Sequence, residues 1–196
     1  MGILDFWSIG CEPMPKRVVL LSGNPGVGKT TVLMKTVNSL KERGIRVGGM
    51  ISREVREGGA RVGFEILDLT SSRRGWLAHI NQKSGPQVGK YRVNIEDLNA
   101  IGAGAVTDAV EKCEVIAIDE IGPMELLSEE FKDAAWKALD SRKLVIAVVH
   151  WNAEDRLIKE VKKREDAEII TVTVENREKL DKQITEKTLE FLKQIS

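Results

Sequence analysis

The chain has 196 residues, of which 42% are apolar, and this suits one domain with a sizeable buried core. Its 30 basic and 30 acidic residues cancel, so no overall charge attracts nucleic acid or an anionic membrane, and the longest apolar run, residues 144–149, is far shorter than the ~20 residues that span a bilayer. The two cysteines are too few for a disulfide framework or a cysteine metal site, which predicts a reduced, cytoplasmic protein.

The chain is predicted to divide after residue 16. Residues 1–16 lack the basic start and long apolar core of a secretion signal, and they are interpreted as an N-terminal extension whose role is unknown. No internal repeat, and no linker rich in proline, glycine or serine, interrupts the remainder. Residues 17–196 are therefore predicted to form a single domain.

Residues 18–31, VVLLSGNPGVGKTT, combine a short apolar strand with a glycine-rich turn. They match G-x-x-x-x-G-K-[ST], the phosphate-binding P-loop, which requires a strand before it and a helix after it. Leu33, Val37 and Leu40 supply the helical spacing. The glycines let successive backbone N–H groups surround an anion, Lys29 reaches the outer phosphates, and the Thr30 hydroxyl binds Mg²⁺. The segment therefore predicts nucleotide binding.

The next segments predict an antiparallel excursion. Residues 45–55 and 60–69 have the composition of strands, and the turn at 57–59 joins them into a β-hairpin. Residues 70–94 are turn-rich and basic, with short extended pieces at WLAHI and KYRVN. Residues 95–110 then show a helical apolar pattern, which Gly102 and Gly104 weaken.

The second half alternates strands with helices. The nearly all-apolar segment 115–119 is predicted to be a central parallel strand, and Ser128 is the predicted cap of the helix after it. Residues 144–149 and 168–174 are predicted strands, with helices at 154–164 and at the C-terminus. This alternation predicts an α/β fold, a P-loop NTPase with a mostly parallel sheet flanked by helices and an antiparallel hairpin excursion.

Asp119 and Glu120 end the central strand and complete the predicted site. An aspartate after an apolar strand is expected to hold Mg²⁺ directly or through water, so Thr30 and Asp119 are the predicted metal residues. A carboxylate beside the metal-binding one can orient and deprotonate the attacking water, which makes Glu120 the predicted general base. The pair therefore favours hydrolysis of the bound nucleotide.

Two other function classes stay open. A nucleotide, nucleoside or small-molecule kinase needs an acceptor site and an arginine-rich lid, and Arg53, Arg56, Arg73 and Arg74 keep this alternative open. A nucleotide-dependent binding switch or nucleic-acid motor is disfavoured, because the two signs of charge are interleaved and only 5% of the residues are aromatic.

A second cation is expected beside the phosphates. Negative charge develops on the γ-phosphoryl oxygens in the transition state, and Lys29 alone seldom neutralises it. Arg56 is the first candidate, with Arg53 and Arg73 behind it. The predicted catalytic residues are therefore Lys29, Arg56 and Glu120.

With these motifs in order, residues 17–196 resemble the small nucleoside-triphosphatase family, the cancer-related nucleoside-triphosphatases. The resemblance rests on GNPGVGKTT, SREVREGGARVGFEILDL, VGKYRVN, IDEIGPMELLS and ENR at 175–177. It implies Mg²⁺-dependent hydrolysis of ATP, GTP and other NTPs to NDP and phosphate, with broad base tolerance. Nucleoside triphosphates are thus the expected partners, without nucleic acid or membrane. The oligomeric state stays open, and a monomer is compatible with the sequence.

The resemblance also marks positions in the site. It draws attention to Arg56, Lys90, Glu125, Asn176 and Arg177 without giving them a role, and Pro123 stands where lysine is common in the family. The nucleotide-binding positions that it implies are, in the phosphate loop, Gly23, Asn24, Pro25, Gly26, Val27, Gly28, Lys29 and Thr30, and, in the second segment, Val115, Ile116, Ala117, Ile118, Asp119, Glu120, Ile121 and Gly122.

Three further side chains have two interpretations each. Asn176 and Trp151 are either contacts to the base or structural residues. His150 ends the strand 144–149, where P-loop proteins often place a polar residue that senses the γ-phosphate, and the alternative is an ordinary strand-end histidine.

Overall fold

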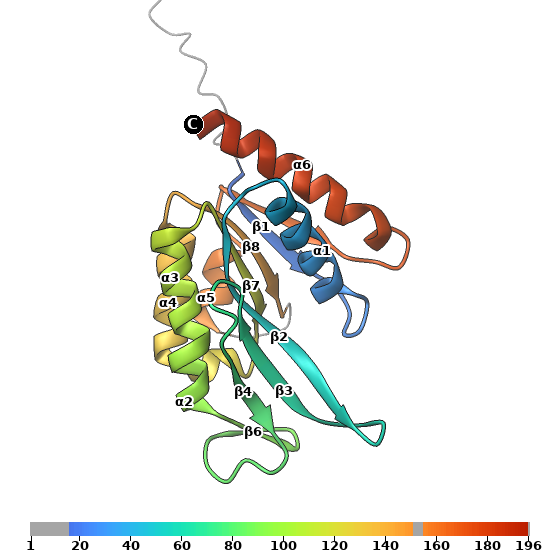
Figure 1. Cartoon of the computed structure of the whole chain (residues 1–196), viewed down its shortest axis with the longest axis vertical. Coiled ribbons are helices and arrows are strands. Elements are labelled where there is room, and N and C mark those ends of the chain that lie inside the picture. Colours follow the sequence, from blue (N-terminus) through green and yellow to red (C-terminus); the bar gives the residue numbers. More distant parts are fainter. Residues whose placement is uncertain (1–15, 151–154, 196) are drawn as a thin grey trace, which may run out of the picture.

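The computed structural model describes residues 16–150 and 155–195 (Figure 1). The predicted N-terminal extension, apart from Lys16, and Trp151 lie outside the described residues. Within the described part of the chain, one nine-stranded sheet has the strand order β5-β6-β4-β3-β2-β7-β8-β1-β9. No helix in that part is long and apolar enough to cross a membrane.

One half of the sheet is parallel, as predicted. Its strands are β2 (Val47–Glu57), β7 (Val115–Ile121), β8 (Leu144–Val149), β1 (Val18–Ser22) and β9 (Ala167–Thr171). Every residue of β1 and β8 is buried, because helices cover both faces and a strand buried on both sides must be apolar throughout. The prediction of an α/β fold is therefore confirmed.

The helices form a layer on each face of this parallel half (Figure 1). The first layer contains α1 (Lys29–Glu42) and α6 (Arg177–Ile195). The second contains α3 (Gly104–Lys112), α4 (Glu129–Asp140) and α5 (Arg156–Val161). The P-loop joins β1 to α1, so the strand and helix that the motif requires are both present.

The antiparallel half is larger than the single hairpin that the sequence predicts. It consists of β3 (Ala60–Asp68), β4 (Arg74–His79), β6 (Tyr91–Val93) and β5 (Gln87–Val88), added in that order to β2. The inner part of β2, Val47 to Ile51, pairs with β7, whereas its outer part pairs only with β3. The β2–β3 hairpin therefore projects beyond the parallel strands (Figure 1).

The predicted helix at 95–110 is present and runs to residue 112. It consists of α2 (Ile95–Asp97), the π-helical segment η1 (Leu98–Ala103) and α3. Gly102 lies against the sheet, where an added Cβ would come within 3.1 Å of Met50 Sδ. The glycine that weakens the helical pattern therefore allows close packing between helix and sheet.

The start of α4 and the end of β9 are fixed by side-chain hydrogen bonds. Ser128 caps α4 as predicted, its Oγ accepting from Phe131 N at 2.9 Å, after the short 3₁₀ helix η2 (Glu125–Leu127). β9 ends three residues earlier than predicted, because the Asn176 side chain accepts from Thr173 N at 2.8 Å and donates to Thr171 O at 2.9 Å. These bonds turn the chain into α6.

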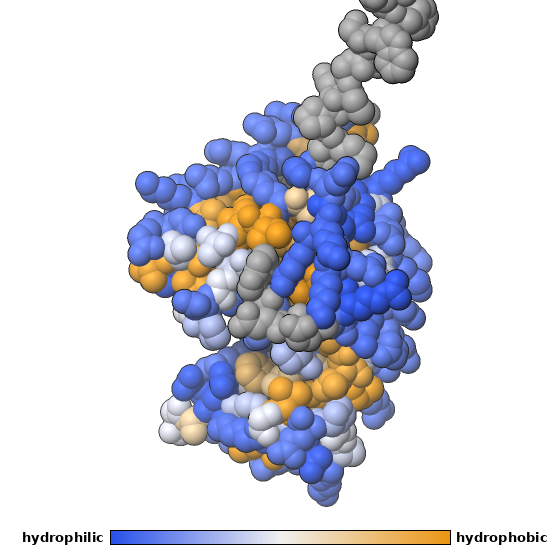
Figure 2. Space-filling view, turned by 180° about the vertical axis from the view of Figure 1, so that it is seen from behind, coloured by the Kyte–Doolittle hydropathy of each residue, from blue (hydrophilic) through white to orange (hydrophobic). Residues whose placement is uncertain are grey.

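Hydrophilic side chains predominate on the face shown in Figure 2, where apolar ones gather in separate areas. Most apolar side chains are enclosed in two cores, one on each face of the sheet. The large apolar residues that are exposed in the described ranges lie in several strands, helices and turns: Trp76, Ile80, Leu127, Ile169, Val174 and Ile195.

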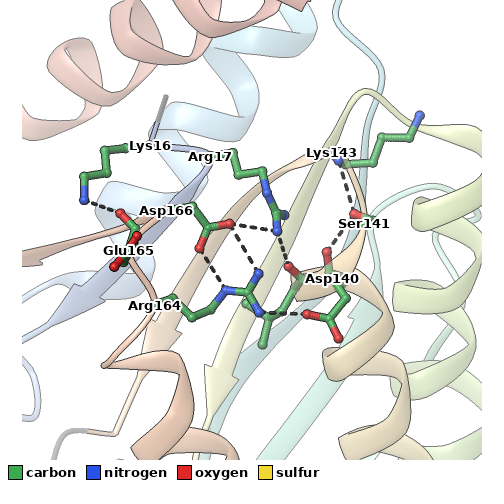
Figure 3. Close-up of polar contacts among 10 residues, drawn as sticks. Lys16, Arg17, Asp140, Ser141, Lys143, Arg164, Glu165 and Asp166 are labelled. Carbon is green, nitrogen blue, oxygen red and sulfur yellow. Dashed lines mark hydrogen bonds and ion pairs between the residues drawn. The ribbon is translucent and has the colours of Figure 1, made fainter. Parts of the chain in front are cut away.

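An ion network joins the amino ends of the parallel strands (Figure 3). Asp166, just before β9, lies 2.7 Å from Arg17 Nη2 and 2.9 Å from Arg164 Nε. Arg17 also donates to Leu139 O at 2.7 Å, and Arg164 reaches Asp140 at 2.7 Å. The network therefore ties the start of β1 to the end of α4 and to the start of β9.

Candidate active site

The P-loop has the backbone shape that its glycines permit. Gly23 has φ 139°, and a Cβ there would lie 2.6 Å from the carbonyl oxygen of Val172. Gly28, with φ 110°, is the N-cap residue of α1 and provides no side-chain cap. The first N–H groups of this 14-residue helix therefore stay available to an anion, as expected of a phosphate loop.

Lys29 lies across the loop that precedes it. Its Nζ donates to the carbonyl oxygens of Gly23 at 2.9 Å and Asn24 at 3.2 Å. From outside, Arg177 donates to the carbonyl oxygen of Val27 at 3.2 Å, which supports the loop from the start of α6. Both cations therefore bond to carbonyl oxygens of the loop, and Lys29 is among the residues that line the cleft.

Thr30 and Asp119 meet, as the sequence predicts. The Thr30 hydroxyl donates to Asp119 Oδ1 at 3.2 Å, and the backbone amide of Ser52 also favours the charged form of this carboxylate. The other oxygen, Asp119 Oδ2, is buried and has no hydrogen-bond partner in the described part of the chain. A hydroxyl and a carboxylate oxygen with a free lone pair are the hard ligands that Mg²⁺ prefers, and Mg²⁺ takes few protein ligands beside phosphate oxygens and water. The pair therefore fits a magnesium ion.

Burial decides the protonation of Asp119. It raises the pKa to about 7, although the hydrogen bond from Thr30 opposes it; the charge of Glu120 adds to the rise, and that of Lys29 also opposes it. A cation beside the carboxylate favours its charged form. The site is therefore better suited to holding a cation than to remaining as a bare carboxylate.

Glu120 and Glu125 lie against Gly122. An added Cβ on Gly122 would come within 3.2 Å of Glu125 Oε2 and 3.3 Å of Glu120 Oε1. Burial raises the pKa of Glu125 to about 8, backbone N–H groups oppose the rise, and the charges of Glu120 and Asp119 add to it. Glu125 is therefore mostly protonated at neutral pH, which removes one negative charge from the surroundings of Glu120.

A cleft of about 1040 Å³ lies between the P-loop and the β2–β3 hairpin. Glu120 and His150 lie at its inner wall, at the carboxyl ends of β7 and β8. The residues that line it are Ser22, Gly23, Asn24, Pro25, Gly26, Gly28, Lys29, Thr30, Thr31, Ser52, Arg53, Glu54, Arg61, Phe64, Glu120, His150 and Thr171.

Arg56 is not brought to the other predicted catalytic residues. It lies near the tip of the hairpin, where Nε donates to Glu54 Oε1 at 2.5 Å and Nη1 to Gly59 O at 2.8 Å. Neither Arg56 nor Arg73 lines the cleft, whereas Arg53 and Arg61 do. The strand register shifts between Val55 and Arg56, and the sequence pattern does not reveal such a shift.

Most of the second predicted segment supports the site from within the core. Val115, Ile116, Ala117 and Ile118 are fully buried in β7, and so is Ile121. Glu120 is the residue of this segment that lines the cleft, and Asp119 is the one that bonds Thr30. The apolar residues therefore fix the two carboxylates in place and do not themselves face the cleft.

Several cleft residues were not found from the sequence. Thr171 ends β9 at the same edge as the P-loop, and the rule that ligands bind at the carboxyl ends of parallel strands could have found it. Ser52, Glu54, Arg61 and Phe64 come from the hairpin, of which the sequence predicts only Arg56 and Arg53 for a place beside the phosphates.

The structure also gives the positions of three other residues that the sequence analysis named. His150 lines the cleft, and its Nδ1 is buried without a partner in the described ranges, so its γ-phosphate role stays a prediction. Asn176 turns the chain after β9. Lys90 lies over the Tyr91 ring, 5.4 Å from its centroid, and does not line the cleft.

Comparison with known proteins decides the family. The model of a family described as NTPase matches residues 18–185. The chain belongs to this NTPase family. It is 47% identical to a protein named nucleoside-triphosphatase THEP1 from Thermofilum pendens, over 87% of this chain and 94% of that relative. It is 43% identical to the protein of the same name from Methanosarcina acetivorans, over 89% of this chain and 98% of that relative.

Two solved structures of the NTPase family share the fold. The crystal structure of THEP1 from Aquifex aeolicus has a TM-score of 0.74 at 29% identity, and covers 85% of this chain and 96% of its own. The solution structure of a human cancer-related nucleoside triphosphatase has a TM-score of 0.73 at 33% identity, over 87% of this chain and 96% of its own. The P-loop, Asp119 and Glu120 thus belong to a fold shared by proteins named for NTP hydrolysis.

Proposed function

We propose that this member of the NTPase family hydrolyses nucleoside triphosphates to the diphosphate and phosphate with Mg²⁺. The observation that carries the proposal is the contact between Thr30 and Asp119 at 3.2 Å, with Glu120 next to Asp119 in the same cleft. A phosphate loop, a pair of metal-binding oxygens and a neighbouring carboxylate are together what hydrolysis requires.

The chain's own groups account for each step. The N–H groups of the P-loop and Lys29 hold the β- and γ-phosphates, and Glu120 orients a water molecule and accepts its proton. The water oxygen bonds to the γ-phosphorus, the bond to the β–γ bridging oxygen breaks, and the nucleoside diphosphate leaves with that electron pair. Mg²⁺, when bound at Thr30 and Asp119, supplies positive charge to the phosphate oxygens.

Broad base tolerance follows from where the proposed contacts lie. The P-loop, Lys29, Thr30 and Asp119 would all contact phosphates or the metal, which every NTP shares.

We also propose a cytoplasmic location on the composition, and in the described residues Cys113 is a free, buried thiol.

The test is phosphate release from ATP, GTP, CTP and UTP, each with Mg²⁺ and with a chelator. We expect release from all four at rates of the same order, and loss of release with the chelator. The Lys29→Ala protein, prepared in the same way, controls for contaminating phosphatases because it lacks the phosphate-loop cation.

A parallel search for a phosphorylated acceptor distinguishes hydrolysis from the kinase alternative. Release to water that does not depend on an acceptor supports the proposal. Stoichiometric transfer to a small molecule, or absence of any phosphate release, contradicts it.

A further inference from the structure

Among the described residues three arginine or lysine side chains line the cleft, and they differ in whether they bond to other residues of the protein. Lys29 bonds to two carbonyl oxygens of the P-loop. Arg61 donates to Tyr91 Oη at 2.8 Å and to Glu54 Oε2 at 2.9 Å. The side chain of Arg53 makes no hydrogen bond or ion pair with any residue of the described ranges, and Arg53 lines the cleft. It is therefore the cation there that is available to a ligand.

The register of β2 places Arg53 close to the phosphate site. Ile51 pairs with Asp119 on the neighbouring strand β7, and the next residue, Ser52, lines the cleft. Arg53 follows directly, so its Cα lies two strand residues, roughly 7 Å, beyond the partner of Asp119. The long arginine side chain covers a distance of that order.

The alternation of side chains along β2 also places Arg53 on the same face of the sheet as α1. Ile51 packs in the core that contains Val32 and Leu33 of α1. Residues i and i+2 of a strand share a face, so Arg53 lies on the α1 side of the sheet, one position further out. The N-terminal end of α1, with Lys29 and Thr30, lies across the same cleft. Beyond Ile51 β2 has no pairing with β7, so this edge of the strand is open to the cleft.

The other arginines of the hairpin are held elsewhere. Glu54 accepts from Arg56 through Oε1 and from Arg61 through Oε2. The Arg61 guanidinium also lies over the Phe64 ring, 5.2 Å from its centroid, and over the Tyr91 ring at 5.6 Å. Glu54 and the two rings therefore hold the guanidinium groups of Arg56 and Arg61, and Arg53 is the hairpin arginine whose side chain has no such partner in the described residues.

We propose that Arg53 contacts the γ-phosphate of the bound nucleotide and is the second cation of the reaction. The proposal rests on the proposed function and replaces Arg56 as the leading candidate for this role. An arginine presents a planar fork of donors that matches two phosphate oxygens and keeps its charge at every working pH. A cation in this place stabilises the charge that develops on the γ-phosphoryl oxygens. It has no contact with a bound nucleoside diphosphate, because the diphosphate lacks the γ-phosphate.

The test compares Arg53→Ala with Arg56→Ala and Arg74→Ala. Arg74 is the matched control, because it is an exposed arginine of the same antiparallel half, paired with Glu65 at 3.4 Å and outside the cleft. Each protein is measured for turnover and KM with Mg·ATP, for affinity toward ADP, and for affinity toward ADP with aluminium fluoride, which imitates the transferring phosphoryl group.

For Arg53→Ala we expect turnover to fall about 10²–10³-fold, the usual effect of removing one transition-state donor. The gain in affinity that aluminium fluoride gives to ADP should disappear, while affinity for ADP alone stays as in the wild type. Arg53→Lys should recover part of both losses, because it restores the charge but not the fork. Arg74→Ala should behave as the wild type.

Two results would overturn the proposal. One is wild-type turnover in Arg53→Ala with a large loss in Arg56→Ala. The other is equal loss of affinity for ADP and for ADP with aluminium fluoride, which would make Arg53 a general nucleotide contact. The melting temperature of each variant checks folding, and Arg53→Gln repeats the test with a longer polar side chain. If the wild type itself releases no phosphate, the proposed function fails. If the wild type releases phosphate and Arg53→Ala does so at the same rate, only the assignment of Arg53 as the second cation fails.

Discussion

The two ends of the parallel strands differ in how many of their charged side chains are paired within the protein. At the carboxyl end Asp119 Oδ2 and His150 Nδ1 are buried without partners in the described residues, and Arg53 faces the cleft unpaired. At the amino end Arg17, Arg164, Asp140 and Asp166 form ion pairs with one another, and of their side-chain atoms Arg17 Nη1 is the one that is buried without a partner in the described residues (Figure 3). The polar groups at the carboxyl end are therefore available to a ligand, whereas those at the amino end link segments of the chain to one another.

The pKa values of the buried acids shift in opposite directions at the two ends. Burial raises the pKa of Asp119 to about 7 and that of Glu125 to about 8. Burial also works against the charged form of Asp166, yet hydrogen bonds from Arg164 and the charge of Arg17 lower its pKa. Without a bound cation the catalytic end therefore destabilises the folded state at high pH, whereas the amino-end network stabilises it.

Glu120→Gln should have the largest effect, and it falls on the catalytic end alone. The amide keeps the size of the side chain but removes its basicity, so turnover should fall by about 10²–10⁴-fold. Binding of ATP, measured by calorimetry, should survive. Asp119→Asn is the companion variant, and it should also weaken Mg²⁺-dependent binding. Near wild-type turnover in Glu120→Gln would exclude Glu120 as the base.

Glu125→Gln should stabilise the protein at high pH. The folded pKa of Glu125, about 8, exceeds its ordinary 4.5, so its contribution is most favourable below about pH 4.5 and is lost as the pH rises to about 8. The variant should therefore gain a few kcal/mol over the wild type above pH 8 and little near pH 5. Chemical denaturation at several pH values, with chelator and without nucleotide, measures the difference; a gain that does not vary with pH contradicts the burial argument.

Asp166→Asn should weaken the amino end and leave the catalytic end intact. Losing the charged acceptor that Arg17 and Arg164 share should cost about 1–3 kcal/mol of unfolding free energy, with no change in ATP affinity. Asp108→Asn is the matched control, because its pair with Lys112 is exposed and an exposed pair contributes little to stability. Equal losses in the two variants would show that burial of the network adds nothing.

Deleting residues 1–13 should have the smallest effect. The network begins at Arg17, so the described domain has its first anchoring contact without them. We expect the melting temperature and the rate of phosphate release to match those of the full chain. A clear fall in either would show that the deleted residues pack onto the domain.

The sequence by itself determined the phosphate loop, its flanking strand and helix, and the pair Asp119–Glu120. These features depend on neighbouring residues: glycines such as Gly23 permit a backbone that other residues do not, and Ser128 caps a helix that begins at the next residue. The family motifs were likewise contiguous, and the match to residues 18–185 confirmed the family that they indicated. Such local rules need no knowledge of the rest of the chain.

Only the tertiary structure decided which distant side chains meet. Arg53 faces the cleft and Arg56 does not because β2 pairs with β7 in one register, leaves it after Ile51, and shifts its register against β3 near Arg56. A change of one residue in that register would exchange the two faces of the strand. The same holds for Glu125, whose pKa depends on burial against Gly122, and for Arg17 and Asp166, whose strands are neighbours only in the folded sheet. Strand order and burial are properties of the whole core, so no short segment of the sequence encodes them.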